Sequence, residues 1–258
     1  MCRLLGVIAN KPVDLEFSLT KFRKYASCNI DGWGIGWYVD GKPEVFKEKI
    51  SAQRSEQFPI LSKEVCSRII ISHVRLGSRG VPSEHNSHPF KFGKWIFAHN
   101  GTVDREHLLS NLDEKYKREI RGETDSEVYF YWILQCIEES GDVVEGIKKA
   151  LENVVKASHS GLNFLLSDGS SLYALRYSDK PSKDYSLYWL RRDPSESGVL
   201  EGVSHETKAL IRSKMLKSEK AVLICSEKLT KKEGWKAIEL GTLLKIDSKL
   251  KVDRVKIM

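Results

Sequence analysis

The pattern of apolar residues near the start of the chain predicts one strand, one helix and one hairpin. Residues 2–8 are apolar apart from Arg3, as expected for a buried strand. Residues 33–39 and 44–47 are extended segments, and the Asp40-Gly41 pair between them favours a tight hairpin turn. Between the strand and the hairpin, apolar side chains recur at the spacing of one helix face, at Leu15, Leu19, Phe22 and Tyr25.

The middle of the chain continues with strands and then changes to helices. Residues 68–76 and 94–99 are rich in Ile, Val, Trp and Phe and are expected to be core strands. A polar helical segment is expected before them, at 55–65. Two further helices are expected at 125–139 and 143–156, and the acidic start of the first suits the positive end of a helix dipole.

From residue 162 onward, short alternating or apolar segments predict strands joined by turns. The expected strands are 162–166, 171–177, 187–191, 221–225, 242–246 and 251–257, with turn-rich stretches at 178–184 and 193–198. Because strands follow strands and helices follow helices, this order favours an α+β layered sandwich with largely antiparallel sheets over a doubly wound parallel fold. No linker or repeat divides the sequence, so residues 1–258 are expected to form a single domain.

Composition and charge limit the class of protein. The chain is 41% hydrophobic and 30% charged, as in soluble globular proteins, and apolar runs such as 129–134 are far shorter than the roughly 18 to 20 residues of a membrane span. The net charge of +7 is spread in pairs such as Lys148-Lys149, without a dense basic block. We therefore expect neither nucleic acid nor a membrane as partner. The N-terminus lacks the features of a secretory leader, so a cytoplasmic location is expected.

The five cysteines indicate neither a disulfide framework nor a metal site. Their number is odd, they are scattered, and no C-x-x-C pair or zinc-ligand spacing is present. No metal or other cofactor is therefore expected. Cys66, Cys136 and Cys225 lie within apolar patterns and are predicted to be small buried hydrophobic residues.

Cys2 is the candidate nucleophile because of its position. A cysteine here could simply be a small residue at the start of a strand. If Met1 is removed, however, the chain begins with a residue that carries both a thiol and a free α-amine, whose reference pKa is about 7.7 to 8.0. That amine can accept the thiol proton and later return it to a departing ammonia, so a single residue supplies nucleophile and base. The mature chain is then expected to start at Cys2.

The His99-Asn100-Gly101 sequence follows an apolar strand and is a candidate oxyanion hole. The side-chain amide of Asn100 and the backbone N–H of Gly101 are neutral donors suited to the oxyanion of a tetrahedral intermediate, and glycine allows close approach. The alternative is a turn that ends the strand, because Asn-Gly strongly favours turns.

Two charged residues could bind the head of a free amino acid. Arg75 follows an apolar strand, where its guanidinium could clamp a carboxylate, and Asp125 lies at an expected helix start, where it could receive an ammonium group. Each has a structural alternative: an ion-pair partner for Arg75 and a helix N-cap for Asp125.

A glycine-rich stretch, DGWGIGWY, includes Gly34 but lacks the strand–loop–helix context of a nucleotide-binding loop. Its glycines are expected to let a loop and a strand pass close to the active site. His88, in the sequence NSHPF, could shape the same substrate pocket. A structural histidine is the alternative there, rather than a proton carrier or metal ligand.

Taken in order, MCRLLG, DGWGIGWY, HVRLGSRG, NSHPF, HNG and ETDSE resemble the class II glutamine amidotransferase domain of the N-terminal-nucleophile (Ntn) hydrolases, in particular its small stand-alone branch. The resemblance implies a four-layer αββα sandwich, with Cys2 as nucleophile and Asn100 with Gly101 as oxyanion hole. It also implies that Arg75 and Asp125 grip the α-carboxylate and α-amine. The larger synthases of this superfamily typically have Trp and Thr where this chain has Leu76 and Ser78, and Arg79 is a less familiar residue beside the glycine.

The leading hypothesis is that Cys2 attacks the γ-amide of glutamine to give a γ-glutamyl thioester and ammonia. No synthase domain is recognisable in the sequence, so either a separate synthase subunit accepts the ammonia or the protein hydrolyses a γ-glutamyl peptide or thiol conjugate at the same site. A hypothesis from another class is a non-catalytic regulatory or anion-binding module, which the positive charge would favour.

Overall fold

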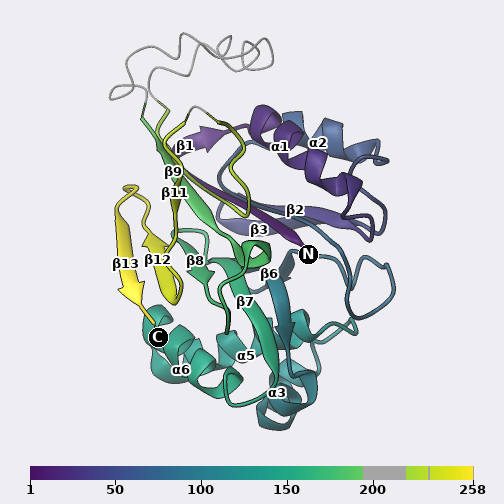
Figure 1. Ribbon diagram of the computed structural model, residues 1–258, viewed down its shortest axis with the longest axis vertical. Coiled ribbons are helices and arrows are strands. Elements are labelled where there is room, and N and C mark those ends of the chain that lie inside the picture. The colour runs from purple at the N-terminus through teal and green to yellow at the C-terminus, as the bar shows by residue number, and fades with distance from the viewer. Residues whose placement is uncertain (194–218, 232, 258) are drawn as a thin grey trace.

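Two antiparallel sheets lie face to face at the centre of the computed structural model, which describes residues 1–193, 219–231 and 233–257 (Figure 1). In spatial order, the seven-stranded sheet contains β11 (Lys236–Ala237), β9 (Tyr188–Arg192), β10 (Ala221–Cys225), β1 (Arg3–Val13), β4 (Ser67–Val74), β2 (Trp33–Val39) and β3 (Lys42–Glu48). The six-stranded sheet contains β13 (Val252–Lys256), β12 (Thr242–Ile246), β8 (Leu172–Arg176), β7 (His159–Ser167), β6 (Trp95–Val103) and β5 (Phe90–Phe92).

Helices cover the outer face of each sheet and complete four layers (Figure 1). The seven-stranded sheet carries α1 (Glu16–Arg23), the 3-10 turn η1 (Lys24–Ser27) and α2 (Gln57–Glu64). The six-stranded sheet carries α3 (Arg105–Asn111), α4 (Glu114–Lys117), α5 (Asp125–Ser140) and α6 (Val143–Val154). A further 3-10 turn, η2 (Lys183–Tyr185), lies between β8 and β9. The predicted αββα architecture is therefore confirmed.

Side chains of β1 alternate between its two faces, so the strand packs against the other sheet on one face and against helices on the other. Leu4 and Ile8 pack between the sheets, whereas Leu5 and Val7 pack toward α1 and α2. Both faces of this strand are buried, so its sequence is apolar at consecutive positions rather than at every second one. The strand pairs with β10 on one side and β4 on the other, which places its N-terminal end beside the end of β4.

Helix α5 has clear start and stop signals in the sequence, and its first residues lie next to the candidate site. The Thr124 hydroxyl accepts a hydrogen bond from the Glu127 backbone N–H, and Gly141 ends the helix in a left-handed conformation (φ 68°). Its residues from Asp125 to Ile137 are all buried, because the six-stranded sheet covers one side and the other helices cover the rest.

Most predicted elements are present, with a few differences. The structure adds β5, β11, α3 and α4, which are short or polar and carry little periodic signal. Cys136 and Cys225 are buried as predicted, but the prediction for Cys66 was wrong. Cys66 is exposed because it lies between two buried neighbours at the entrance to β4, where alternation turns it outward. Apart from Asp193, the turn predicted at 193–198 lies outside the described residues.

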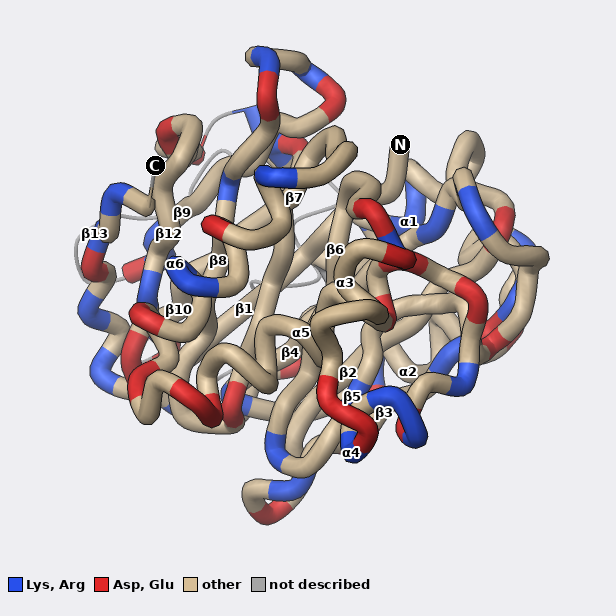
Figure 2. Tube along the Cα trace, turned by 90° about the horizontal axis from the view of Figure 1, so that it is seen from below, with Lys and Arg blue, Asp and Glu red and all other residues tan. Residues whose placement is uncertain are grey.

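In the described part of the chain, lysine and arginine residues are interspersed with acidic residues (Figure 2). Among the described residues, none of the helices has the length and apolar character needed to cross a membrane.

Candidate active site

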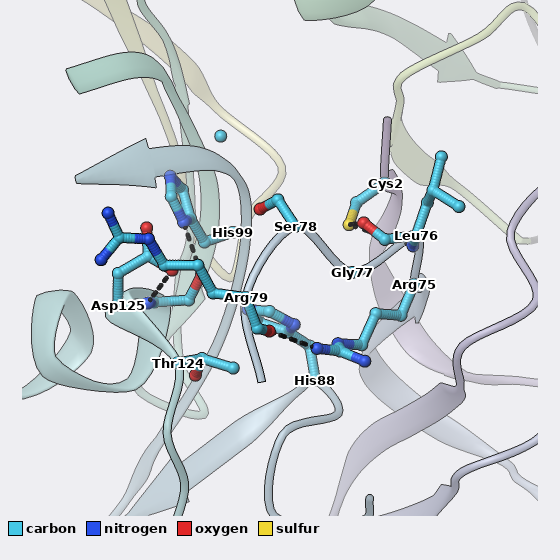
Figure 3. Close-up of a pocket in the computed structure, with 12 residues that line it drawn as sticks. Cys2, Arg75, Leu76, Gly77, Ser78, Arg79, His88, His99, Thr124 and Asp125 are labelled. Carbon is cyan, nitrogen blue, oxygen red and sulfur yellow. Dashed lines mark hydrogen bonds between the residues drawn. The ribbon is translucent and has the colours of Figure 1, made fainter. Parts of the chain in front are cut away.

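The segments that carry the candidate residues meet around one small pocket that is open to solvent (Figure 3). Cys2 immediately precedes β1, and the loop after β4 lies beside Cys2. The segment before β5, strand β6 and the start of α5 complete the walls. The lining residues are Cys2, Arg75, Leu76, Gly77, Ser78, Arg79, His88, His99, Gly101, Thr124, Asp125 and Ser126. Five of the seven residues predicted for the site therefore come together: Cys2, Arg75, His88, Gly101 and Asp125.

Cys2 lies against the backbone of Leu76. Its Sγ is 3.4 Å from both the amide nitrogen and the carbonyl oxygen of that residue. The pairing of Arg3 with Val74 in the β1–β4 ladder fixes this position. Burial raises the pKa of the Cys2 thiol, although the Leu76 contact and nearby positive charges act in the opposite direction. The thiol is therefore protonated near neutral pH and needs a base to become a nucleophile.

Arg75 holds together the loop that follows β4. Its buried guanidinium donates to the carbonyl oxygens of Arg79 (2.6 Å), Gly80 (3.0 Å) and Asp31 (3.4 Å). The loop closes over the guanidinium so tightly that a Cβ on Gly77 would lie 2.7 Å from an Arg75 nitrogen. The carboxylate of Asp31 in turn accepts the Gly77 backbone N–H at 2.8 Å. A carboxylate clamp by Arg75 remains a prediction; the contacts formed here organise the loop.

Gly101 lies within β6 at a point where no other residue fits. The strand runs on to Val103, with an irregularity in its pairing to β7 between Gly101 and Val103, so the alternative of a strand-ending turn was wrong. Gly101 has φ +151°, and a Cβ on it would lie 1.6 Å from the carbonyl oxygen of Gly161. The backbone of Gly101 can therefore face the pocket only because it has no side chain.

Asn100 is adjacent to the pocket but does not line it. Its side-chain Nδ2 donates to the carbonyl oxygen of Asp184 at 3.4 Å, and its buried Oδ1 has no partner among the described residues. The predicted oxyanion donor thus has a competing acceptor in the 178–186 loop. Its role remains a prediction.

Asp125 is the first residue of α5 and is buried. Its Oδ2 accepts the backbone N–H of Val103 at 2.8 Å, and its Oδ1 accepts that of Ser126 at 3.0 Å. Because Thr124 is the N-cap, the N-cap alternative for Asp125 was wrong. Asp125 instead fixes the end of β6 against the start of α5 while lining the pocket.

Two buried histidines, His88 and His99, line the pocket, and a third, His73, lies against His88; all three are neutral near pH 7. His99 Nε2 faces the Gly161 carbonyl at 3.3 Å; a carbonyl only accepts, so Nε2 donates and Nδ1 accepts from the Ser126 hydroxyl at 2.9 Å. The rings of His73 and His88 stack with centroids 4.2 Å apart. Burial lowers the pKa of His73 to about 3, that of His99 to about 4, and that of His88 well below its ordinary value.

These histidines are expected to make the protein sensitive to acid. A histidine with a lowered folded-state pKa binds its proton more readily in the unfolded chain, so stability is lost as pH falls from about 6.5 toward the folded value. His73 alone contributes a slope of up to about 1.4 kcal/mol per pH unit in that window. Urea unfolding at pH 7.5 and 5.0 checks this. His73→Asn should reduce the dependence of the unfolding free energy on pH, whereas the same change at exposed His85 should not. An equal pH dependence in the unmodified protein and both variants would contradict this explanation.

Gly34 lies behind the pocket wall rather than in it. A Cβ on Gly34 would lie 2.3 Å from the His88 carbonyl oxygen, and one on Gly32 would lie 2.4 Å from Ser87 Oγ. The glycines of β2 and the turn before it therefore let the segment that carries His88 pass close by, as predicted. A direct substrate contact for Gly34 remains a prediction.

Sequence reasoning gave no role to His99, and it missed six further lining residues, namely Leu76, Gly77, Ser78, Arg79, Thr124 and Ser126. These six lie in the motifs around Arg75 and Asp125, so their adjacency to those residues was the available signal. His73 begins the HVRLGSRG motif, but its stacking on His88 forms only in the folded chain and could not be predicted from the sequence. In the part of the chain that the structure describes, no group of three or more His, Cys, Asp or Glu side chains is placed to hold a metal ion.

Comparison with known proteins agrees with this architecture. The protein is 34% identical over 95% of its length to the uncharacterized protein MJ1515 of Methanocaldococcus jannaschii, covering 68% of that protein. It is 30% identical over 93% of its length to Escherichia coli YafJ, covering 95% of it. A glutamine aminotransferase class-II domain protein from Silicibacter pomeroyi superposes with a TM-score of 0.69 at 22% identity, with 99% of each chain covered.

The sequence model of the family described as class-II glutamine amidotransferases matches residues 1–251, which include every wall of the pocket. With its two central antiparallel sheets, outer helices and pocket at Cys2, the chain belongs to the class II glutamine amidotransferase family and has its Ntn-hydrolase fold.

Proposed function

We propose that this protein is an N-terminal-cysteine amidohydrolase that cleaves the side-chain amide of glutamine through a γ-glutamyl thioester on Cys2. The position of the Cys2 thiol carries the proposal: it lies in the wall of a pocket that also contains Gly101 and Asp125. A thiol, a backbone donor and a carboxylate are the groups needed to attack an amide, stabilise its oxyanion and hold an amino-acid ammonium.

The base in this proposal is the α-amine of Cys2, freed when Met1 is removed. With Met1 present, its carbonyl accepts hydrogen bonds from Asn29 Nδ2 (2.7 Å) and Arg3 Nη1 (3.0 Å), and the Cys2 nitrogen is an amide without useful basicity. His88 and His99 line the pocket, but their lowered pKa values make them weak bases. An amine with a reference pKa of about 7.7 to 8.0 is better matched to neutral pH.

The proposed reaction has two stages. The amine takes the thiol proton, the bond between Sγ and the amide carbon forms, and the amide oxygen becomes an oxyanion that faces the backbone of Gly101. Asn100 becomes a second donor to this oxyanion if its side-chain amide turns away from the Asp184 carbonyl. The intermediate collapses with cleavage of the C–N bond, and the leaving nitrogen takes the proton as ammonia. Water then attacks the thioester, which releases glutamate and regenerates the thiol.

A γ-glutamyl peptide or thiol conjugate is the second candidate substrate. Leu76, which lines the pocket, is 38% exposed, and two neighbouring loop residues, Ile30 and Val81, are 59% and 66% exposed. Exposed apolar side chains on these loops would suit a leaving group larger than ammonia. A separate synthase subunit that accepts ammonia is the corresponding partner if glutamine is the donor.

Substrate assays test the proposal directly. Purified protein beginning at Cys2 should release glutamate from glutamine or from γ-glutamyl dipeptides, with ammonia or the free amino acid as the second product. A higher kcat/KM for glutamine supports the amidotransferase assignment, and a higher kcat/KM for the dipeptides supports the hydrolase. No glutamate from either substrate, in protein shown by mass to lack Met1, would refute both.

A further inference from the structure

Two side-chain donors converge on the carbonyl oxygen of Met1. Asn29 Nδ2 lies 2.7 Å from this oxygen, and Arg3 Nη1 lies 3.0 Å from it. Asn29 is only 3% exposed, so its amide is a buried donor that faces the N-terminus. A side-chain amide and a guanidinium together are donors well suited to a carbonyl or carboxylate oxygen. The Met1 carbonyl therefore occupies a site that can bind such an oxygen from another molecule.

Both donors are also held by contacts that do not involve Met1. Arg3 Nε pairs with Glu227 Oε1 at 3.2 Å, which leaves Nη1 directed toward the N-terminus. Asn29 Nδ2 also lies within reach of the Val74 carbonyl oxygen, at 3.4 Å. Removal of Met1 therefore takes away the main acceptor of the two donors but not the contacts that position them.

The site lies on the leaving-group side of the nucleophile. In the proposed reaction the α-amine of Cys2 returns a proton to the leaving nitrogen, which must come within roughly 3 Å of that amine. The Met1 carbonyl carbon is bonded to the same Cys2 nitrogen, so its oxygen lies within about 2.5 Å of that nitrogen. In Figure 3, Cys2 lies at the opposite end of the pocket from Asp125, where the head of the γ-glutamyl group is expected.

The chemistry of an amino-acid leaving group fits this position. In a γ-glutamyl amino acid or peptide, the leaving nitrogen is bonded to an α-carbon that carries a carboxylate or a peptide carbonyl. When the nitrogen approaches the Cys2 amine, that oxygen can reach the place of the Met1 oxygen. Ammonia, the leaving group of glutamine, has no oxygen to bind there.

We propose that removal of Met1 opens a leaving-group subsite, in which Asn29 and Arg3 bind the carboxylate or carbonyl oxygen of the departing amino acid or peptide. This inference rests on the proposed function and names its substrate class: γ-glutamyl amino acids and peptides are bound through both halves. The covalent steps stay the same. The C–N bond breaks, the leaving nitrogen takes the proton from the Cys2 amine, and water hydrolyses the thioester.

Calorimetric binding to the Cys2→Ala chain, prepared with and without Met1, tests the subsite without turnover. The ligands are γ-L-glutamylglycine and γ-L-glutamylethylamide, which are similar in size and differ in the carboxylate of the leaving group. We expect the chain without Met1 to bind γ-glutamylglycine about 10- to 100-fold more tightly than the ethylamide, the range for a charge-assisted hydrogen bond. The chain that retains Met1 should lack this preference, because the Met1 oxygen fills the site.

Two substitutions in the chain without Met1 assign the preference to its residues. Arg3→Gln removes the charge, and Asn29→Asp replaces the amide donor by an acceptor of the same shape, so each should remove most of the preference. Arg68→Gln is the matched control, because the Arg68 guanidinium also donates to backbone carbonyls, but outside the pocket. With Cys2 in place, the ratio of kcat/KM for the two substrates should change in the same way.

Several outcomes would overturn the inference: equal binding of the two ligands without Met1, a preference that persists with Met1 attached, or a preference that survives both substitutions. Failure of the chain without Met1 to bind either ligand would also overturn it. The two proposals can fail separately. A carboxylate preference in binding, with no glutamate released when Cys2 is present, refutes the catalytic proposal alone. Equal kcat/KM for the two substrates keeps the catalytic proposal and refutes the subsite.

Discussion

Replacing Cys2 by alanine is expected to lower the rate of glutamate release on the order of 10⁴-fold or more, the scale seen when a covalent nucleophile is removed. The folded structure should change little. Cys2 is partly exposed, and within the described part of the chain its thiol forms hydrogen bonds only with the backbone of Leu76. The free energy of unfolding should stay within about 1 kcal/mol of the unmodified protein, as for most substitutions outside a packed core.

Cys66→Ala is the matched control for this prediction, because Cys66 is an exposed cysteine outside the pocket. It should retain full activity. Urea unfolding of both variants separates loss of chemistry from loss of fold. If Cys2→Ala still releases glutamate at a substantial rate, the thioester mechanism is wrong. If an anionic ligand binds equally well before and after the change in a protein without activity, the non-catalytic anion-binding module becomes the better description.

Gly101→Ala is expected to be the most damaging change of a single small residue. A Cβ there would lie 1.6 Å from the Gly161 carbonyl oxygen, and φ of +151° is unfavourable for any side chain. Overpacking and backbone strain each cost about 1 to 3 kcal/mol, so the free energy of unfolding should fall by about 2 to 6 kcal/mol. Activity should also fall in the folded fraction, because the proposed oxyanion donor must move away from Gly161.

Gly93→Ala separates the two causes. Gly93 also has positive φ (+54°), but nothing lies within 4 Å of a Cβ placed on it. We expect it to lose about 1 kcal/mol from backbone strain alone and to keep its activity. Denaturant unfolding followed by circular dichroism gives both free energies. A Gly101→Ala protein as stable as Gly93→Ala would show that the close packing of Gly101 on β7 is not required.

The parts of the fold that could be predicted are those with a repeating local signal. The helix that begins at Asp125 follows Thr124, a capping residue, and continues with a long apolar run, and the hairpin of β2 and β3 has a strong turn at Asp40-Gly41. Strand β5, which has only three residues, is defined mainly by its pairing to β6 and cannot be recognised from its own sequence. Cys66 was misjudged because an apolar neighbourhood does not say which face of the chain a residue occupies.

The candidate site was predictable as a set of residues but not as a set of contacts. The sequence motifs identified Cys2, Gly101 and Asp125 as candidates, and the structure places all three in the same pocket. The sequence could not show that Arg75 would bond to backbone carbonyls or that Asn100 would face Asp184, because both contacts depend on loops from elsewhere in the chain.

The central claim is that Cys2, freed of Met1, is an activated thiol in a pocket shaped for glutamine. Intact mass spectrometry before and after treatment with a glutamine-derived diazo-ketone tests it most directly. The account predicts a starting mass without Met1 and the gain of a single adduct that maps to Cys2. Retention of Met1 with no adduct, or an adduct on another cysteine, would contradict it.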